Sequence, residues 1–225
     1  MDKDIFDTNS KVKTILCYGD SNTWGWVPSS MGTKRYNSNN RWPGVLQKLL
    51  GLDYKIIEEG LGARTTMFDD PRPELPLRNG LKTLPIVLET HNPLNLVIIM
   101  LGTTDAKEMM NLSVIEITEG MRALISAVKN MKTLENTSQT KILIVVPAVV
   151  KEDADFASKL FKEATEKTTA LIDSYKTLAE EEEDVFYLNP NDAIVVDEIE
   201  GVHIDNHNHR KLGELVADKV KQIFS

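Results

Sequence analysis

Cysteine is almost absent from this chain of 225 residues, which contains only Cys17. A single cysteine excludes an internal disulfide and any set of several cysteines that could hold a metal ion. Because Cys17 lies within an apolar stretch, we interpret it as a core residue and not as a reactive thiol.

Positive charge is also scarce, with 26 Lys and Arg against 34 Asp and Glu and a formal net charge of −8. The basic residues form no cluster, whereas nucleic acids and anionic membrane surfaces are bound by concentrated positive charge. The composition therefore argues against both as partners and is compatible with small neutral or cationic substrates.

Long hydrophobic runs are missing as well. Residues 1–10 are polar and of mixed charge, without the apolar core of a signal peptide, and no segment is long enough to span a bilayer. We therefore expect a cytoplasmic protein. The length fits one domain, residues 1–225, in which residues 1–10 form a poorly ordered N-terminal segment.

Two kinds of apolar segment alternate along the chain. Short segments typical of buried strands lie at 12–17, 54–58, 95–101, 141–146 and 184–188. Longer segments with helical periodicity lie at 41–50, 81–89, 113–131, about 156–180 and about 208–224. The uninterrupted apolar run at 97–101 is typical of a central strand in a parallel sheet. The alternation predicts an α/β fold with three layers, α/β/α, and a five-stranded parallel sheet.

Glycines and polar residues follow the first three of these strands. The segments are Gly19-Asp20-Ser21, Gly60-Leu61-Gly62-Ala63 and Gly102-Thr103-Thr104-Asp105. They should meet at the carboxyl edge of the sheet, where open α/β sheets bind ligands, together with the loop that contains His203. Gly19 permits a sharp turn there, and Ser21 is a candidate nucleophile.

Ser21 lies near the N-terminus, while an acid and a histidine, Glu200 and His203, lie near the C-terminus. Acyl transfer by a serine requires a base, a group that orients the base, and donors for the oxyanion. The chain has no Gly-x-Ser-x-Gly elbow, which argues against the α/β-hydrolase arrangement. Two other interpretations stay open. Most Asp-Ser pairs are ordinary turns or helix caps, and Glu200, His203 and His207 could surround zinc, although no zincin His-x-x-x-His motif is present.

Four segments, in this order, resemble the conserved blocks of the SGNH, or GDSL-type, hydrolase superfamily and its arylesterase-like branch. They are GDSNTWGWVP at 19–28, EEGLGARTT at 58–66, LGTTD at 101–105 and EGVH at 200–203. The resemblance implies a flavodoxin-like SGNH hydrolase fold and a serine esterase that cleaves short-chain, acetyl-type carboxylic esters through an acyl-enzyme. It also implies acyl transfer to alcohols, a homo-oligomer, and a reaction that needs no cofactor and no metal.

By the same resemblance, Ser21 is the nucleophile, His203 the general base, and Glu200, where the family has Asp, the acid that orients the base. The oxyanion hole would consist of the backbone N–H groups of Ser21 and Ala63 and the hydroxyl of Thr104. Thr104 stands where the family has Asn, and a hydroxyl reaches less far than an amide. Ala63 stands where Gly is usual, which costs nothing provided that its φ is not positive.

The residues around the nucleophile, Asp20, Asn22, Trp24 and Trp26, are expected to form the substrate pocket, with the two indoles as walls for a small acyl group. The departures at positions 104 and 200 support a second hypothesis, a binding protein that keeps the fold with weakened catalysis.

Structural roles are expected for three residues near the last helix. Asp205 is the reserve candidate for the acid, although an N-cap of that helix is the better interpretation. His207 and His209 are expected to be solvated at the start of the helix.

Overall fold

The computed structural model describes residues 10–135 and 137–225, so the expectation for residues 1–10 falls, apart from Ser10, outside the described residues. Five parallel strands form one sheet in the order β2-β1-β3-β4-β5. The strands are β1 (Lys13–Gly19), β2 (Tyr54–Gly60), β3 (Leu96–Met100), β4 (Lys141–Val145) and β5 (Val185–Leu188). The expected five-stranded parallel sheet is confirmed.

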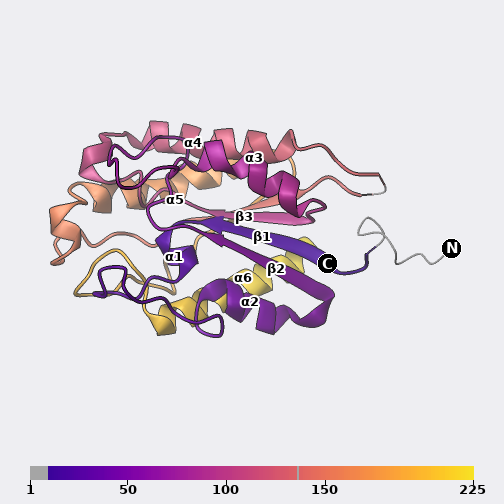
Figure 1. Ribbon diagram of the computed structural model, residues 1–225, viewed down its shortest axis with the longest axis horizontal. Helices are drawn as coiled ribbons and strands as arrows, with labels where there is room; N and C mark the ends of the chain where they lie inside the picture. The colour runs from indigo at the N-terminus through magenta and orange to yellow at the C-terminus, as the bar shows by residue number, and fades with distance from the viewer. Residues whose placement is uncertain (1–9, 136) are drawn as a thin grey trace.

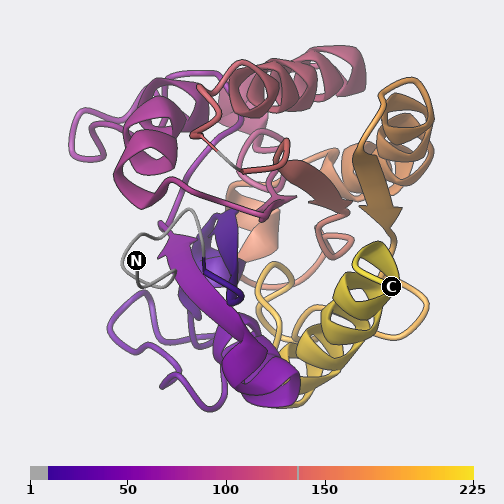
Figure 2. The same cartoon turned by 90° about the vertical axis from the view of Figure 1, so that its right-hand side faces the viewer.

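Helices cover both faces of this sheet (Figures 1 and 2). They are α1 (Ser21–Trp24), α2 (Trp42–Leu50), α3 (Gly80–His91), α4 (Val114–Lys129), α5 (Ala164–Glu180) and α6 (Asn206–Ile223), with short 3₁₀ turns η2 (Gly51–Asp53), η3 (Glu108–Met110) and η4 (Ala157–Lys159). Helices α3, α4 and α5 lie on one face and α2 and α6 on the other, which confirms three layers.

Alternation along β1 explains how one strand supports two cores. Leu16 and Tyr18 point into the cluster formed with α3, α4 and α5, whereas Ile15 and Cys17 point into the cluster formed with α2 and α6. Successive side chains of a strand face opposite sides of the sheet. Cys17 is fully buried, as expected of a core residue.

One helix boundary differs from the expectation. The segment expected to be helical from about residue 156 contains the short turn η4, and α5 begins only at Ala164. Glu163 has a φ of 65°, a left-handed conformation that interrupts a right-handed helix. Phe161 is buried in a separate small cluster with Val150 and Val202. The residues before α5 therefore cover the carboxyl edge of the sheet instead of extending the helix.

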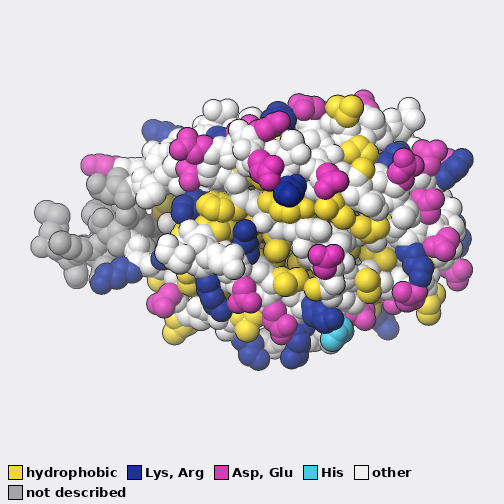
Figure 3. Space-filling model, turned by 180° about the vertical axis from the view of Figure 1, so that it is seen from behind, with side chains coloured by type: hydrophobic (Ala, Val, Ile, Leu, Met, Phe, Trp, Pro, Cys, Tyr) yellow, Lys and Arg dark blue, Asp and Glu magenta, His cyan; other side chains and the backbone are white. Residues whose placement is uncertain are grey.

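The described helices include none that is long and apolar enough to cross a membrane. On the face shown in Figure 3, acidic and basic side chains are interspersed, and hydrophobic side chains form a band across the middle. This mixture on the outer surface contrasts with the interior of the site below.

The start of α6 contains one correction. Asp205 caps the helix by accepting a hydrogen bond from the backbone N–H of Asn208 at 2.8 Å, and His207 is exposed, both as expected. His209, however, is fully buried. Its Nδ1 accepts a hydrogen bond from the backbone N–H of Trp42 at 3.3 Å, so it joins α6 to the first turn of α2. Two histidines at i and i+2 do point apart, but one of them points into the core.

Burial lowers the pKa of His209 to about 3. In the unfolded chain a histidine has a pKa of about 6.5, so the unfolded state takes up a proton first as the pH falls. The stability that neutral His209 contributes is therefore complete above pH 6.5 and is lost as the pH falls from there towards 3.

We predict that His209→Asn reduces the loss of stability between pH 7 and pH 5. The asparagine Oδ1 can accept the Trp42 N–H and does not titrate. Urea unfolding at the two pH values should show a loss that is smaller by about 2 kcal/mol in the variant than in the wild type. Equal losses in the two proteins would contradict this assignment.

Candidate active site

Ser21 is held on a tight turn at the carboxyl end of β1. Asp20 is the N-cap of α1, and its Oδ1 accepts a hydrogen bond from the backbone N–H of Asn22 at 2.9 Å. A Cβ on Gly19 would lie 2.1 Å from Thr23 Oγ1, and a Cβ on Gly60 would lie 2.2 Å from the backbone nitrogen of Trp24. Both distances are too short for a side chain to be present. The absence of side chains at these glycines lets α1 pack directly on the ends of β1 and β2, which fixes the position of the serine.

A continuous series of hydrogen bonds joins Ser21 to a histidine and a carboxylate. His203 Nε2 lies 2.8 Å from Ser21 Oγ, and His203 Nδ1 is hydrogen-bonded to Glu200 Oε1. Since a carboxylate can only accept, Nδ1 carries the proton, and Nε2 is free to accept the proton of the serine hydroxyl. The three side chains are buried, with Ser21, His203 and Glu200 exposed by 7%, 5% and 2%. This is the arrangement that activates a serine for nucleophilic attack.

Glu200 is held as a carboxylate. Burial raises its pKa, but the hydrogen bond and charge of His203 outweigh this effect, so the pKa lies below its usual value. The other oxygen, Oε2, accepts backbone N–H groups from Val202 at 3.0 Å and His203 at 2.7 Å. Asp205, the reserve candidate, is engaged in capping α6. The structure thus brings Glu200, and not Asp205, into contact with the histidine.

Asn22 connects the serine turn to the histidine loop. Its Nδ2 donates to the carbonyl oxygen of Val202 at 3.3 Å, and its Oδ1 accepts the backbone N–H of Ile204 at 3.0 Å. These two bonds enclose His203 on both sides along the chain. Asn22 therefore holds the serine turn against the histidine loop, whereas the sequence analysis expected it to line the substrate pocket.

The two tryptophans have different surroundings. The indole of Trp26 stacks on the His203 ring with centroids 4.7 Å apart and an angle of 13° between the planes. Trp24 meets Trp26 edge-on at 6.4 Å and carries the guanidinium of Arg35 over its ring at 5.0 Å. Trp26 thus packs on the imidazole, and Trp24 packs against Trp26.

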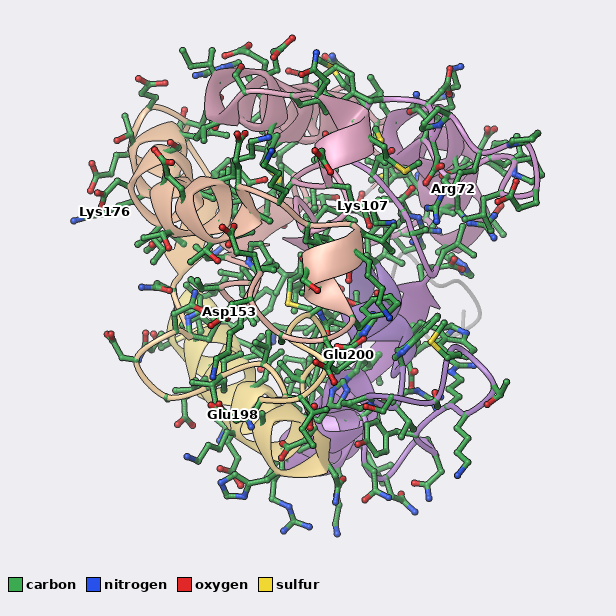
Figure 4. All side chains as sticks on the ribbon, turned by 90° about the vertical axis from the view of Figure 1, so that its left-hand side faces the viewer. Arg72, Lys107, Asp153, Lys176, Glu198 and Glu200 are labelled. Carbon is green, nitrogen blue, oxygen red and sulfur yellow. The ribbon has the colours of Figure 1, made fainter. Side chains whose placement is uncertain are left out.

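A cavity of about 250 Å³ lies beside Ser21. It is lined by Ser21, Trp26, Gly62, Ala63, Arg72, Leu75, Arg78, Thr103, Thr104, Lys107, Phe156, Leu160, Phe161, Val202 and His203. Of the four residues expected to form the pocket, Trp26 lines this cavity, whereas Asp20, Asn22 and Trp24 stand outside its lining. Figure 4 looks onto this carboxyl edge, with Lys107 and Arg72 above Glu200.

Two groups of cavity residues, one aromatic and one cationic, were not expected from the sequence. The aromatic side chains of Phe156 and Phe161 come from the segment that was expected to be helix, and their place could not be read from its periodicity. The cationic side chains of Arg72, Arg78 and Lys107 come from loops whose paths depend on tertiary contacts.

The three residues expected to form the oxyanion hole, Ser21, Ala63 and Thr104, all border this cavity. Ala63 has a φ of 62°, so the proviso that its φ is not positive fails. A residue with a Cβ in this left-handed region is strained by roughly 1–2 kcal/mol relative to an ordinary conformation. Ala63 therefore borders the cavity in a conformation that glycine would adopt without this strain.

Buried polar contacts fasten the loops after β2 and β3 to each other. Asp105 accepts the backbone N–H of Thr66 at 3.0 Å and its hydroxyl at 2.6 Å. Burial raises the pKa of Asp105 to about 6, against the effect of these hydrogen bonds. Arg64 donates to the carbonyl oxygen of Gly19 at 2.9 Å and lies 4.0 Å over the Tyr18 ring. Ala63 and Thr104 thus sit on loops that are linked to each other and to the end of β1.

Metal binding finds no support among residues 10–135 and 137–225, where no group of at least three His, Cys, Asp or Glu side chains could hold a metal ion. The exposed His207 and the hydrogen-bonded pair of Glu200 and His203 do not form such a group.

Comparisons with known proteins gave matches to a family and to solved structures. The model of the GDSL-like Lipase/Acylhydrolase family matches residues 17–209. The chain is similar to the carbohydrate acetylesterase Est24 from Sinorhizobium meliloti, with 38% identity and a TM-score of 0.86 over 94% of this chain and 100% of that one. It is equally similar to the aryl esterase of M. smegmatis, with the same identity, coverage and TM-score. A comparison with curated protein sequences gave no match.

We predict that Ala63→Gly stabilises the protein by up to about 1 kcal/mol, because release of the left-handed strain exceeds the added entropy of the unfolded chain. The matched control is Ala123→Gly inside α4, which should cost about 1 kcal/mol. Urea unfolding of both variants checks the difference, and a loss at position 63 as large as that at position 123 would contradict the strain.

Proposed function

Since the chain belongs to the GDSL-like lipase/acylhydrolase family, the SGNH hydrolases, we propose that it is a serine esterase that hydrolyses short-chain, acetyl-type carboxylic esters. The observation that carries the proposal is the hydrogen-bonded series Ser21–His203–Glu200 beside a cavity that also contains Ala63 and Thr104. The two similar esterases, one named for aryl esters and one for acetylated carbohydrates, support the same class of reaction.

The reaction proceeds in two acyl transfers. Ser21 Oγ attacks the ester carbonyl while His203 Nε2 accepts the hydroxyl proton, and Glu200 stabilises the imidazolium that forms. The oxyanion is held by the backbone N–H groups of Ser21 and Ala63 and by the Thr104 hydroxyl. His203 then gives its proton to the oxygen of the departing alcohol, which leaves an ester between the acyl group and Ser21.

Water completes the cycle. His203 takes a proton from a water molecule as the water oxygen attacks the acyl-enzyme. The second tetrahedral intermediate then collapses to the carboxylic acid, and His203 returns the proton to Ser21 Oγ. No cofactor takes part in these steps.

The size and walls of the cavity support a short acyl group. About 250 Å³ is below the range of roughly 300–1,000 Å³ that is typical of sites for drug-sized ligands. Trp26, Phe156, Phe161 and Leu160 supply apolar surface next to the nucleophile. Such walls disfavour water, so we propose that alcohols compete with water for the acyl-enzyme and that the protein also transfers acyl groups.

Steady-state hydrolysis of 4-nitrophenyl acetate, butyrate and octanoate tests the proposal. We predict that kcat/KM falls from the acetate to the octanoate, and that Ser21→Ala lowers the activity on acetate by at least about a thousandfold. Ser126→Ala, an exposed serine in α4, is the matched control and should behave as the wild type.

Far-ultraviolet circular dichroism should confirm that Ser21→Ala is folded. If the wild type shows no Ser21-dependent hydrolysis of any of the three esters, the esterase proposal fails, and the binding protein with weakened catalysis becomes the function to pursue.

Thr104 can be tested as an oxyanion donor by Thr104→Asn, which introduces the longer amide that the family has at this position. Because a good oxyanion donor is worth about a hundred- to a thousandfold in kcat, we predict a rise in kcat of roughly tenfold on 4-nitrophenyl acetate. The same substitution at the neighbouring Thr103 should give no rise. An unchanged or lower kcat in Thr104→Asn would remove Thr104 from this role.

A further inference from the structure

The charged side chains that line the catalytic cavity, besides His203, are all cationic. They are Arg72, Arg78 and Lys107, and the lining contains no Asp or Glu. This is opposite in sign to the net charge of −8 and differs from the mixed outer surface in Figure 3. A molecule that reaches Ser21 therefore meets cationic side chains and no carboxylate on the wall of the cavity.

Lys107 is the most enclosed of the three. Its side chain comes from the loop after β3, only 5% of the residue is exposed, and its Nζ lies 5.6 Å from the centre of the Phe161 ring. Within the described residues this ammonium makes no hydrogen bond or ion pair, and Nζ is not one of the fully buried polar atoms, so it borders the open space of the cavity. An ammonium that faces a confined cavity with no carboxylate bonded to it can form a charge-assisted hydrogen bond with an anionic group of a ligand.

The surroundings of Lys107 leave it charged near neutral pH. Burial lowers its pKa to about 8, and the positive charge of Arg72 acts in the same direction. The carboxylates of Asp70, Asp20 and Asp105 oppose this from a distance. Lys107 thus keeps its proton at pH 7 while no carboxylate forms an ion pair with it in the described structure.

The two arginines differ in whether a carboxylate is bonded to the guanidinium. Arg72 donates to Asp70 Oδ1 through Nε at 2.8 Å and to Oδ2 through Nη2, so its charge is neutralised. Arg78 donates through Nη1 to the carbonyl oxygen of Pro76 at 2.7 Å, while its Nε is buried without a partner in the described residues. Arg78 and Lys107 are therefore the two cations of the cavity that a ligand could pair with.

We propose that this esterase selects esters that carry a carboxylate close to the ester group, and that Lys107, assisted by Arg78, binds this carboxylate. The proposal rests on the esterase function proposed above and names its substrate class. A neutral ester of the same shape leaves the ammonium unpaired, whereas the anionic one pairs with it in a site that excludes water. Buried polar groups that lose their partner reject the wrong substrate strongly, which makes Lys107 a specificity-determining residue.

The carboxylate could belong to either half of the ester, and two substrate pairs separate these cases. In 4-acetoxybenzoate it lies on the alcohol half, and in the 4-nitrophenyl monoester of succinic acid it lies on the acyl half. The methyl ester of each carboxylate is its neutral partner. The measured quantity is the ratio of kcat/KM for the anionic ester to kcat/KM for its methyl ester, which does not depend on the amount of active enzyme.

The wild type should show a ratio of at least ten in one of the two pairs, and the pair that shows it identifies the half that carries the charge. Lys107→Met, which keeps the length of the side chain without its charge, should lower that ratio at least tenfold. Lys107→Arg should retain most of it. Lys176→Met is the control, because Lys176 lies on α5 and points away from the cavity in Figure 4, and its ratio should equal that of the wild type.

The outcomes distinguish the two proposals. Ser21-dependent hydrolysis with a ratio near one in both pairs, or a ratio that Lys107→Met leaves unchanged, overturns the carboxylate site and leaves the esterase intact. If no ester is hydrolysed, the esterase proposal fails. The site is then tested by titrating Ser21→Ala with 4-acetoxybenzoate and with the succinate monoester, followed by the tryptophan fluorescence of the protein. Saturable binding that Lys107→Met abolishes supports the site, and no binding overturns it.

Discussion

The hydrogen bond between Ser21 and His203 joins residues 182 positions apart, and much of the carboxyl edge is arranged to hold it. A serine and an imidazole approach within hydrogen-bonding distance only if both parent loops are fixed. Asp20 fixes the serine turn by capping α1. Glu200 fixes the histidine loop by accepting hydrogen bonds from both the backbone N–H and the ring of His203. Asn22 then ties the two sides together with two hydrogen bonds. Because these partners are buried, loss of any one would leave an unpaired polar group in a dry environment.

The register of the sheet sets the geometry of the rest of the site. Gly19 pairs with Gly60 on one side and with Met100 on the other, so β1, β2 and β3 end at the same level. The three loops that follow start side by side, and Leu61 donates its N–H to the carbonyl oxygen of Gly19 at 3.0 Å. Ala63, with its positive φ, lies within the tight turn that the Arg64 N–H closes on the carbonyl oxygen of Leu61 at 3.0 Å. The sheet thus determines where the loops beside Ser21 begin, and the loops determine which groups border the cavity.

Sequence patterns predicted the fold, and they pointed to Ser21, His203 and Glu200, which the structure brings into contact, but they did not reveal the residues that support this contact. Apolar runs and helical stripes reflect burial on the two faces of a sheet, so strands and layers could be inferred from periodicity. Ser21 and His203 stand at strand and helix boundaries, which are visible in the chain. The role of Asn22, the burial of His209 and the break before Ala164 depend on contacts across many residues. A pattern confined to neighbouring positions contains no record of such contacts.

The charge balance beneath the cavity shows why Lys107 is better understood through a ligand than through the fold. Two buried carboxylates, Asp20 and Asp105, contribute to the electrostatics of its surroundings, and a lysine that only compensated them would be expected to pair with one of them. Neither forms an ion pair with Lys107 in the described residues: Asp105 accepts two groups of Thr66, and Asp20 accepts the N–H of Asn22 through Oδ1, while its Oδ2 has no hydrogen-bond partner there. The ammonium is left facing the space beside Ser21, where its charge is available to a substrate. An acidic protein can in this way bind an anion, because the field that a substrate meets is set by the few charges within the cavity and not by the net charge of the chain.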